Sequence, residues 1–265
     1  MDMLHAGAVA GGAATNQVKI KGLDCPLEIR HSPRATRLSL KVSHTRRAAI
    51  LTLPRRARLE DAGDFVARHL DWLRDQTRKL PQPVPLACGA VIPLRGMAHK
   101  VEFIGPVRSE SVVMPEGEGD GVWQGYWADR EVTEAALPRL RVSGEPDHAP
   151  RRLADWLKAQ ARADLSERVA HHAGALDVAP KRISVRDQST RWGSCSCSGS
   201  LSFSWRLIFA PAFVLDYVAA HEVAHLREMN HGPRFWRLVR DTMPEMNAAR
   251  RWLREYGAEL HRFQI

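Results

Sequence analysis

The hydrophobic positions in the first third of the chain predict strands followed by one helix. Between residues 26 and 53 apolar side chains alternate with polar ones, as at Leu38, Leu40 and Val42, which indicates a small meander of half-buried strands. Apolar residues then recur at helical spacing over residues 59–80. This segment is therefore expected to form a single amphipathic helix.

The middle of the chain has a weaker pattern. Short strands are predicted at residues 91–94, 100–104 and 137–142, whereas residues 110–120 are rich in Gly, Glu and Ser and indicate a loop or an insertion. The run at residues 144–147 combines Gly, Glu, Pro and Asp, which is typical of a linker between two folding units.

The last third of the chain is mostly helical. Apolar residues line one face of residues 151–174, and the alternating residues near Val185 and at 201–207 predict a hairpin. Pro211 then predicts the start of another helix, because proline is favoured at the first helical position. We find no internal repeat.

These elements predict an α+β fold in three parts. Residues 1–16 are expected to be a disordered tail, residues 17–148 a β-rich module with one helix, and residues 149–265 a helix-rich core. The tail has neither the basic start nor the apolar stretch of a secretory signal. The sequence has no run of eighteen apolar residues that would predict a membrane span, so a cytoplasmic location is expected.

Composition narrows the class of protein only a little. The chain has 265 residues, and its four cysteines include no C-x-x-C pair, which favours reduced thiols over a disulfide framework. The net charge is +9, but the excess is spread along the chain and no basic arm is present. A nucleic-acid partner is therefore not favoured on charge alone.

The strongest chemical signal is the run from His221 to His225 inside the last predicted helix. Two histidines four residues apart lie on one helix face, so both imidazoles can bind one metal ion. Glu222 lies beside that face, where it could accept a proton from a water molecule on the metal. The pattern predicts a catalytic zinc site with one zinc ion per chain.

A catalytic zinc ion needs a third protein ligand, and two residues could supply it. Glu228 follows on the same helix face, whereas His231 lies beyond the expected helix end. We favour His231, because a tetrahedral site needs a ligand from a second direction. Asn230 in a left-handed conformation and the Gly232-Pro233 pair would let the chain turn there. Glu228 would then be exposed or would orient a liganding imidazole.

Three segments form a further pattern when they are read together: Arg191–Ser196, Leu201–Leu207 and His221–Trp236. In these segments the chain resembles the YgjP-like metallopeptidase family, which is related to the SprT-like zinc proteases. The resemblance implies a zincin-like core, zinc on His221, His225 and His231, Glu222 as the catalytic residue, and a peptide or protein substrate. Relative to the family pattern, residues 105–135 resemble an insertion.

The segment at residues 191–196 leaves two interpretations open. Trp192 and Ser194 could form a wall of the substrate cleft, with Ser194 bonding to an extended peptide, or Trp192 could lock a tight hairpin into the core. Cys195 and Cys197 are expected to be small buried residues rather than metal ligands.

The predicted function is peptide-bond hydrolysis by a zinc-bound water with Glu222 as general base. Two alternatives of other classes remain: a zinc protein tethered to DNA, which the SprT-like relatives suggest, and a zinc module without turnover. A continuous basic stripe across the zinc would favour the first alternative.

Overall fold

The computed structural model describes residues 16–43, 46–107, 113–116, 127, 137–188 and 190–264. The expected tail, apart from Asn16, and most of the expected insertion at 105–135 lie outside these residues. The chain divides into two compact units, residues 1–82 and 83–265.

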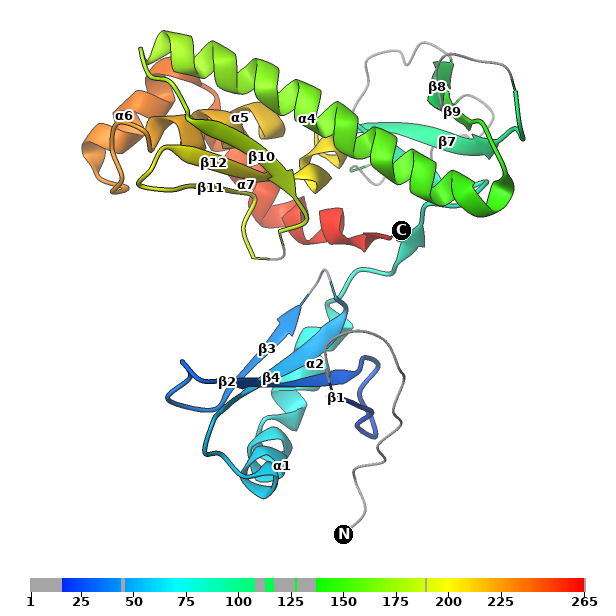
Figure 1. Cartoon of the computed structure of the whole chain (residues 1–265), viewed down its shortest axis with the longest axis vertical. Coiled ribbons are helices and arrows are strands. Elements are labelled where there is room, and N and C mark those ends of the chain that lie inside the picture. Colours follow the sequence, from blue (N-terminus) through cyan, green and yellow to red (C-terminus); the bar gives the residue numbers. More distant parts are fainter. Residues whose placement is uncertain are drawn as a thin grey trace. The chain divides into compact units, whose positions relative to one another are not determined.

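The N-terminal unit is a four-stranded sheet with two helices (Figure 1). Its elements are β1 (Asn16–Val18), β2 (Leu27–Ser32), β3 (Ser39–Ser43), β4 (Ala48–Pro54), α1 (Leu59–Arg68) and α2 (Leu70–Arg78). Alternate residues of β4, including Leu51 and Leu53, are fully buried and pack with Val66 of α1 and Leu73 of α2. The period-two pattern of β4 thus builds the core of this unit.

Two predictions for this unit are wrong in detail. The strand order is β1-β2-β4-β3, with β2 and β4 parallel, so the strands do not form a meander. The expected single helix is interrupted at His69, where the backbone leaves helical geometry between α1 and α2. The ring of His69 bonds instead to the Phe65 carbonyl, one turn earlier.

The C-terminal unit begins with a small sheet of order β6-β7-β9-β8. Its strands are β6 (Val91–Leu94), β7 (Met97–Phe103), β8 (Val113–Glu116) and β9 (Arg139–Val142), which confirms the three strands expected in the middle of the chain. The short strand β5 (Val84–Pro85) pairs with β13 (Phe263–Gln264) near the end of the chain.

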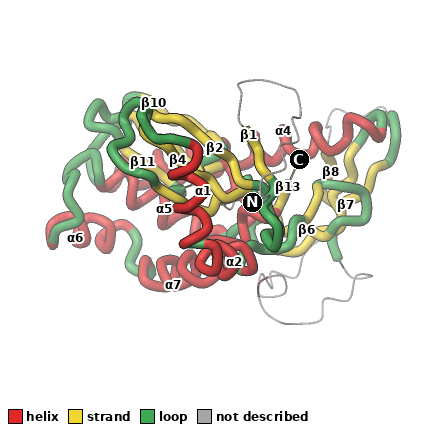
Figure 2. Tube along the Cα trace, turned by 90° about the horizontal axis from the view of Figure 1, so that it is seen from below, coloured by secondary structure: helices red, strands yellow, loops and turns green. Residues whose placement is uncertain are grey.

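The rest of this unit holds the long helix α4 and a second sheet of three strands. Its elements are η2 (Pro146–His148), α4 (Ala149–Ala175), β10 (Arg182–Arg186), β11 (Gly193–Cys195), β12 (Ser200–Ser204), η3 (Trp205–Phe209), α5 (Ala212–Ala224), α6 (Pro233–Thr242), α7 (Met246–Tyr256) and η4 (Gly257–Arg262). Helix α5 contacts α4, α6, α7 and β11 (Figures 1 and 2). Fully buried side chains of α4, β12, η3 and α5 form one continuous core.

The predicted hairpin of the C-terminal sheet is wrong. Strand β10 pairs with β12 in parallel, and the antiparallel partner of β12 is β11, so the sheet order is β10-β12-β11. The antiparallel pair therefore comes from the 191–196 segment, which is too short and polar to show a strand pattern in the sequence.

The boundary between the units also differs from the expected one at residue 148. Arg95 and Gly96, both with positive φ, make the tight turn between β6 and β7. Arg95 bonds through its side chain to Asp164 of α4 and through its backbone N–H to Ile208 of η3. The sheet of β6 to β9 thus packs into the C-terminal core, and the boundary lies at 82/83.

Candidate metal centre

Helix α5 carries the two histidines of the motif and is anchored firmly to α4. Asp216 of α5 accepts two hydrogen bonds from Arg168 and one from His172, which is fully buried on α4. Burial raises the pKa of Asp216, but the bonds from His172 and Arg168 outweigh it and hold this pKa below its usual value. The charged network fixes α5 in position beneath the site.

The helix ends where the second histidine begins a turn. α5 stops at Ala224 with His225 as its C-terminal cap, and α6 starts at Pro233. The expected change of direction before His231 is therefore confirmed. Its expected cause is wrong in one respect, because Asn230 is not among the described residues with positive φ. Pro233 begins α6, as expected of the Gly232-Pro233 pair, and the short bond from the Gly232 N–H to the Asn230 carbonyl also shapes the turn.

The structure brings His221, His225 and His231 together. Their ligating nitrogens all lie within 4.8 Å of one another, and the Nε2 atoms of His221 and His231 are 3.1 Å apart. Two nitrogens on one tetrahedral zinc, with bonds of about 2.0–2.1 Å, would be separated by roughly 3.3 Å. The cluster thus has the spacing of a shared metal ion.

Hydrogen bonds to the outer ring nitrogens leave the inner ones free for a metal. His225 Nδ1 donates to the backbone carbonyl of Glu228 at 3.0 Å, and the Tyr217 hydroxyl lies 3.4 Å from His221 Nδ1. A carbonyl can only accept, so it selects the His225 tautomer whose Nε2 has a free lone pair. The orienting role, one of the two alternatives for the Glu228 side chain, is thus filled by the backbone carbonyl of Glu228.

Burial favours the neutral form of the His221 and His225 imidazoles. It lowers the pKa of His221 to about 3, with smaller contributions from the charges of His225, His231 and Arg250. Burial also lowers the pKa of His225. Because a metal binds the unprotonated imidazole, these side chains are ready to bind an ion at neutral pH. The donor set therefore fits zinc.

A buried aromatic ring supports the cluster from below. Phe235 of α6 is fully buried, and its ring centroid lies 4.4–4.9 Å from the centroids of all three imidazoles. Trp236 stacks on His231 at an angle of 23°. Phe235 and Trp236 thus belong to the face of α6 that packs against the three histidines.

Glu222 lies apart from the ligand cluster and against strand β11. A Cβ atom on Gly193 would come within 2.6 Å of Glu222 Cγ and Oε1, closer than real Cβ contacts. Only glycine therefore lets the strand approach this carboxylate. Sequence reasoning missed this role, although Gly193 belongs to the 191–196 segment that it had singled out.

Glu222 is buried, with only 6% of the residue exposed. Burial raises its pKa to about 7, and the charge of the nearby Arg191 opposes this shift in part. A carboxyl group with a pKa near neutrality can both accept and return a proton at physiological pH.

The other residues of the 191–196 segment have distinct surroundings. Trp192 is half-buried and stacks on His261 at 4.9 Å, which supports its packing role. Ser194 is half-buried on β11, opposite Ser202. Cys195 is half-buried and Cys197 is exposed, so the expectation of burial is wrong for Cys197. Neither thiol belongs to the metal-binding group found among the described residues.

Comparisons with known proteins give one family, and the solved structures that match include two metallopeptidase zymogens. The metallopeptidase zymogen of Pyrococcus abyssi abylysin is 19% identical, with a TM-score of 0.33, and the match covers 38% of this chain and 99% of that one. For the zymogen of Methanocaldococcus jannaschii jannalysin the values are 19%, 0.31, 35% and 88%. No curated protein matches the chain.

No described helix has the length and apolar character needed to cross a bilayer.

The model of the YgjP-like metallopeptidase domain matches residues 36–256, which is most of the sequence and includes every residue of the candidate metal centre. This chain therefore belongs to the YgjP-like metallopeptidase domain family.

Proposed function

We propose that this protein is a zinc peptidase in which His221, His225 and His231 hold one zinc ion and Glu222 is the general base. The proposal rests on the convergence of three imidazoles beside a separate, buried carboxylate. Membership of a metallopeptidase family supports the same reaction class.

The ligand set favours a catalytic site over a closed structural one. Within the described part of the chain, no fourth His, Cys, Asp or Glu joins the three histidines. A structural zinc site has four protein ligands, whereas a catalytic site keeps one position open. This difference argues against a zinc module without turnover.

When bound, zinc would lower the pKa of a coordinated water toward about 7 and polarise the substrate carbonyl. Glu222 would accept the proton of the attacking water and return it to the leaving amine. Its raised pKa suits both transfers. Gly193 would allow β11 to hold this carboxylate in place.

Strand β11 would also bind the substrate. In the described sheet β11 pairs with β12 on one side and is the last strand, so its other edge has no strand partner. An extended peptide could add along this edge through backbone hydrogen bonds, with Ser194 as a further partner. Trp192, through its stacking on His261, would keep the strand in position.

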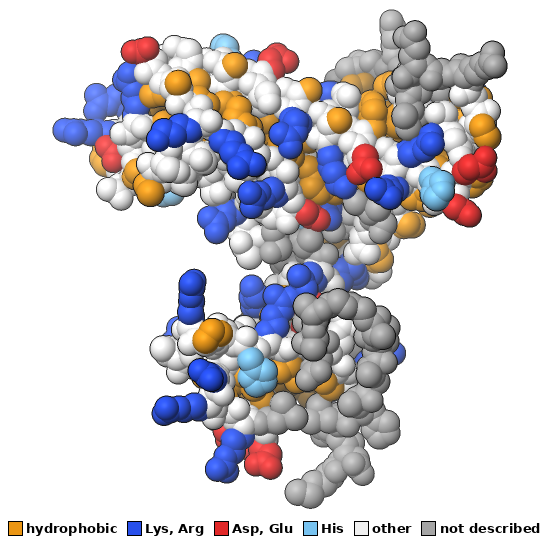
Figure 3. Space-filling model, in the orientation of Figure 1, with side chains coloured by type: hydrophobic (Ala, Val, Ile, Leu, Met, Phe, Trp, Pro, Cys, Tyr) orange, Lys and Arg blue, Asp and Glu red, His pale blue; other side chains and the backbone are white. Residues whose placement is uncertain are grey.

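A DNA-tethered function has less support. Figure 3 shows Lys and Arg side chains distributed over the visible face of the C-terminal unit, with acidic side chains among them. This distribution suits a solvated basic surface more than a track for a phosphate backbone.

A metal-exchange assay tests the proposal. The purified protein should cleave an unfolded protein substrate, lose activity with a chelator, and regain it with about one equivalent of zinc per chain. Cleavage that continues at full rate after complete removal of the metal would exclude this function.

A further inference from the structure

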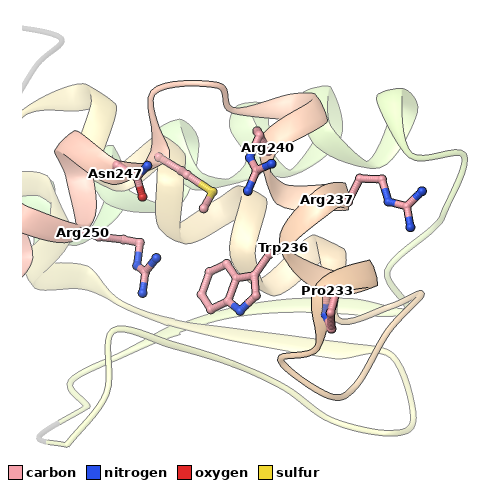
Figure 4. A pocket seen from close by; sticks show the side chains of 7 residues that line it. Pro233, Trp236, Arg237, Arg240, Asn247 and Arg250 are labelled. Atoms are coloured by element: carbon pink, nitrogen blue, oxygen red, sulfur yellow. The ribbon is translucent and has the colours of Figure 1, made fainter.

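A hollow of about 550 Å³ opens beside the metal-binding cluster. It is lined by Pro233, Trp236, Arg237 and Arg240 of α6 and by Met246, Asn247 and Arg250 of α7 (Figure 4). Pro233, Trp236 and Arg240 follow one another at spacings of three and four, as do Met246 and Arg250 at four, so each helix turns one face toward the hollow. Hollows of this volume are large enough for a side chain of a bound ligand.

The indole of Trp236 connects the hollow to the metal centre. One lining residue of the hollow, Trp236, also stacks on His231, with ring centroids 5.7 Å apart, and lies 5.9 Å from the ring of His221. A substrate whose scissile bond lies at the cluster would therefore place a neighbouring group in the hollow.

The hollow has an uncompensated positive charge. The guanidinium of Arg250 lies over Trp236, 4.5 Å from the ring centroid, and Figure 4 shows Arg240 pointing to the same indole while Arg237 turns outward. No acidic residue lines the hollow. Among the described residues, no carboxylate forms an ion pair with any of these three arginines, whereas other arginines of this unit are paired: Arg95 with Asp164, Arg168 with Asp216 and Arg206 with Asp187.

We infer that this hollow binds a carboxylate of the peptide substrate. The carboxylate belongs either to an acidic side chain near the scissile bond or to the C-terminus of the substrate. This inference rests on the proposed peptidase function. Guanidinium groups pair with carboxylates through two parallel hydrogen bonds, and the indole provides an apolar wall for the attached carbon chain. A nucleic acid fits less well, because its phosphates need a basic track longer than one hollow.

Binding of matched peptides to the zinc-loaded Glu222→Gln protein tests the inference without turnover. Three fluorescent peptides share one sequence: one with an internal Glu and an amidated end, one with Gln and an amidated end, and one with Gln and a free C-terminus. We expect one of the two carboxylate peptides to bind about tenfold more tightly than the neutral peptide, the order expected for partly exposed ion pairs. The peptide that binds more tightly identifies the source of the carboxylate.

Arginine variants test which residue causes the tighter binding of the carboxylate peptide. Arg240→Gln in the Glu222→Gln background should remove most of the difference between the peptides. Arg251→Gln is the matched control, because Arg251 is exposed on α7 outside the hollow and its replacement changes the net charge equally. The control should keep the preference. An equal loss in both variants would show a general charge effect and overturn the inference.

Cleavage of the same peptides by the wild type separates the two proposals. If all three peptides are cleaved but bind equally, the proposed function stands and the inference fails. If binding prefers a carboxylate through Arg240 but no peptide is cleaved, the binding inference stands and the proposed function fails. An oligonucleotide that binds through Arg240 more tightly than the peptides, at about 0.15 M salt, would also overturn the inference.

Discussion

Replacing Gly193 with alanine would put a methyl group into the space that Glu222 occupies. The added carbon would lie 2.6 Å from Glu222 Cγ and Oε1 and 2.8 Å from Cδ. Ordinary contacts between such atoms are about 3.5–4.0 Å, so the carboxylate or strand β11 must move by roughly 1 Å. The crowded atoms include Cγ, near the helix backbone, and a simple rotation of the carboxylate would not remove the clash.

A displacement of about 1 Å at a catalytic group can lower the rate by about 10²-fold. We therefore expect kcat/KM of Gly193→Ala to fall roughly a hundredfold. Crowding in a packed site costs about 1–3 kcal/mol of the free energy of unfolding, or a few degrees in Tm for each kcal/mol in a unit of this size. The three atoms nearest to the new methyl group all belong to Glu222 and none to a histidine, so zinc content should not change.

The assay compares Gly193→Ala with Gly257→Ala in peptide cleavage, zinc content and thermal unfolding. Gly257 is a suitable control because a Cβ there would meet the ring of Trp192, the neighbour of Gly193, at 3.5 Å, which is an ordinary contact. The control should keep wild-type activity within a few-fold. Full activity in Gly193→Ala would refute the role of this close approach, and loss of zinc would show that β11 supports the ligands instead.

Three further predictions concern the ligands, pH and nucleic acid. His231→Ala should lower zinc occupancy sharply, whereas Glu228→Ala should not, because only the backbone carbonyl of Glu228 contacts His225; atomic absorption decides between them. In metal-free protein Glu222 has a pKa of about 7, above the unfolded value, so its contribution to stability is full below about pH 4.5 and is lost as the pH rises through 7. Urea unfolding of the metal-free proteins should therefore show Glu222→Gln to be more stable than the wild type by about 3 kcal/mol at pH 8. This difference in the free energy of unfolding should disappear near pH 4.5. Duplex DNA should bind weakly and dissociate by about 0.15 M salt; tight binding there would favour the DNA-linked alternative.

The convergence of the three histidines was predictable because it depends on local chain geometry. A spacing of four residues places His221 and His225 on one helix face whatever the rest of the fold does. Proline at residue 233 prevents the helix from continuing unbroken, so a turn that returns His231 to the cluster was a reasonable expectation. The strands β6, β7 and β9 were likewise visible in local patterns.

Other features depend on contacts between distant segments and could not be read from the sequence. The parallel pairing of β2 with β4 and of β10 with β12 is a choice among strand partners that alternation alone does not determine. The approach of Gly193 to Glu222 depends on how β11 packs against α5. The orienting partner of His225 is a backbone atom, for which no residue type gives a signal.

Glu222 is proposed to act as a base that does not hold the metal, and Glu222→Gln tests this role most directly. Glutamine keeps the volume of the side chain but removes the proton acceptor. Measured on a substrate that the wild type cleaves, kcat should fall by about two to four orders of magnitude, the usual share of general acid–base catalysis, while zinc content stays near one per chain. Unchanged cleavage in this variant would contradict the role of Glu222 as a base, and loss of its zinc would show that Glu222 helps to hold the metal.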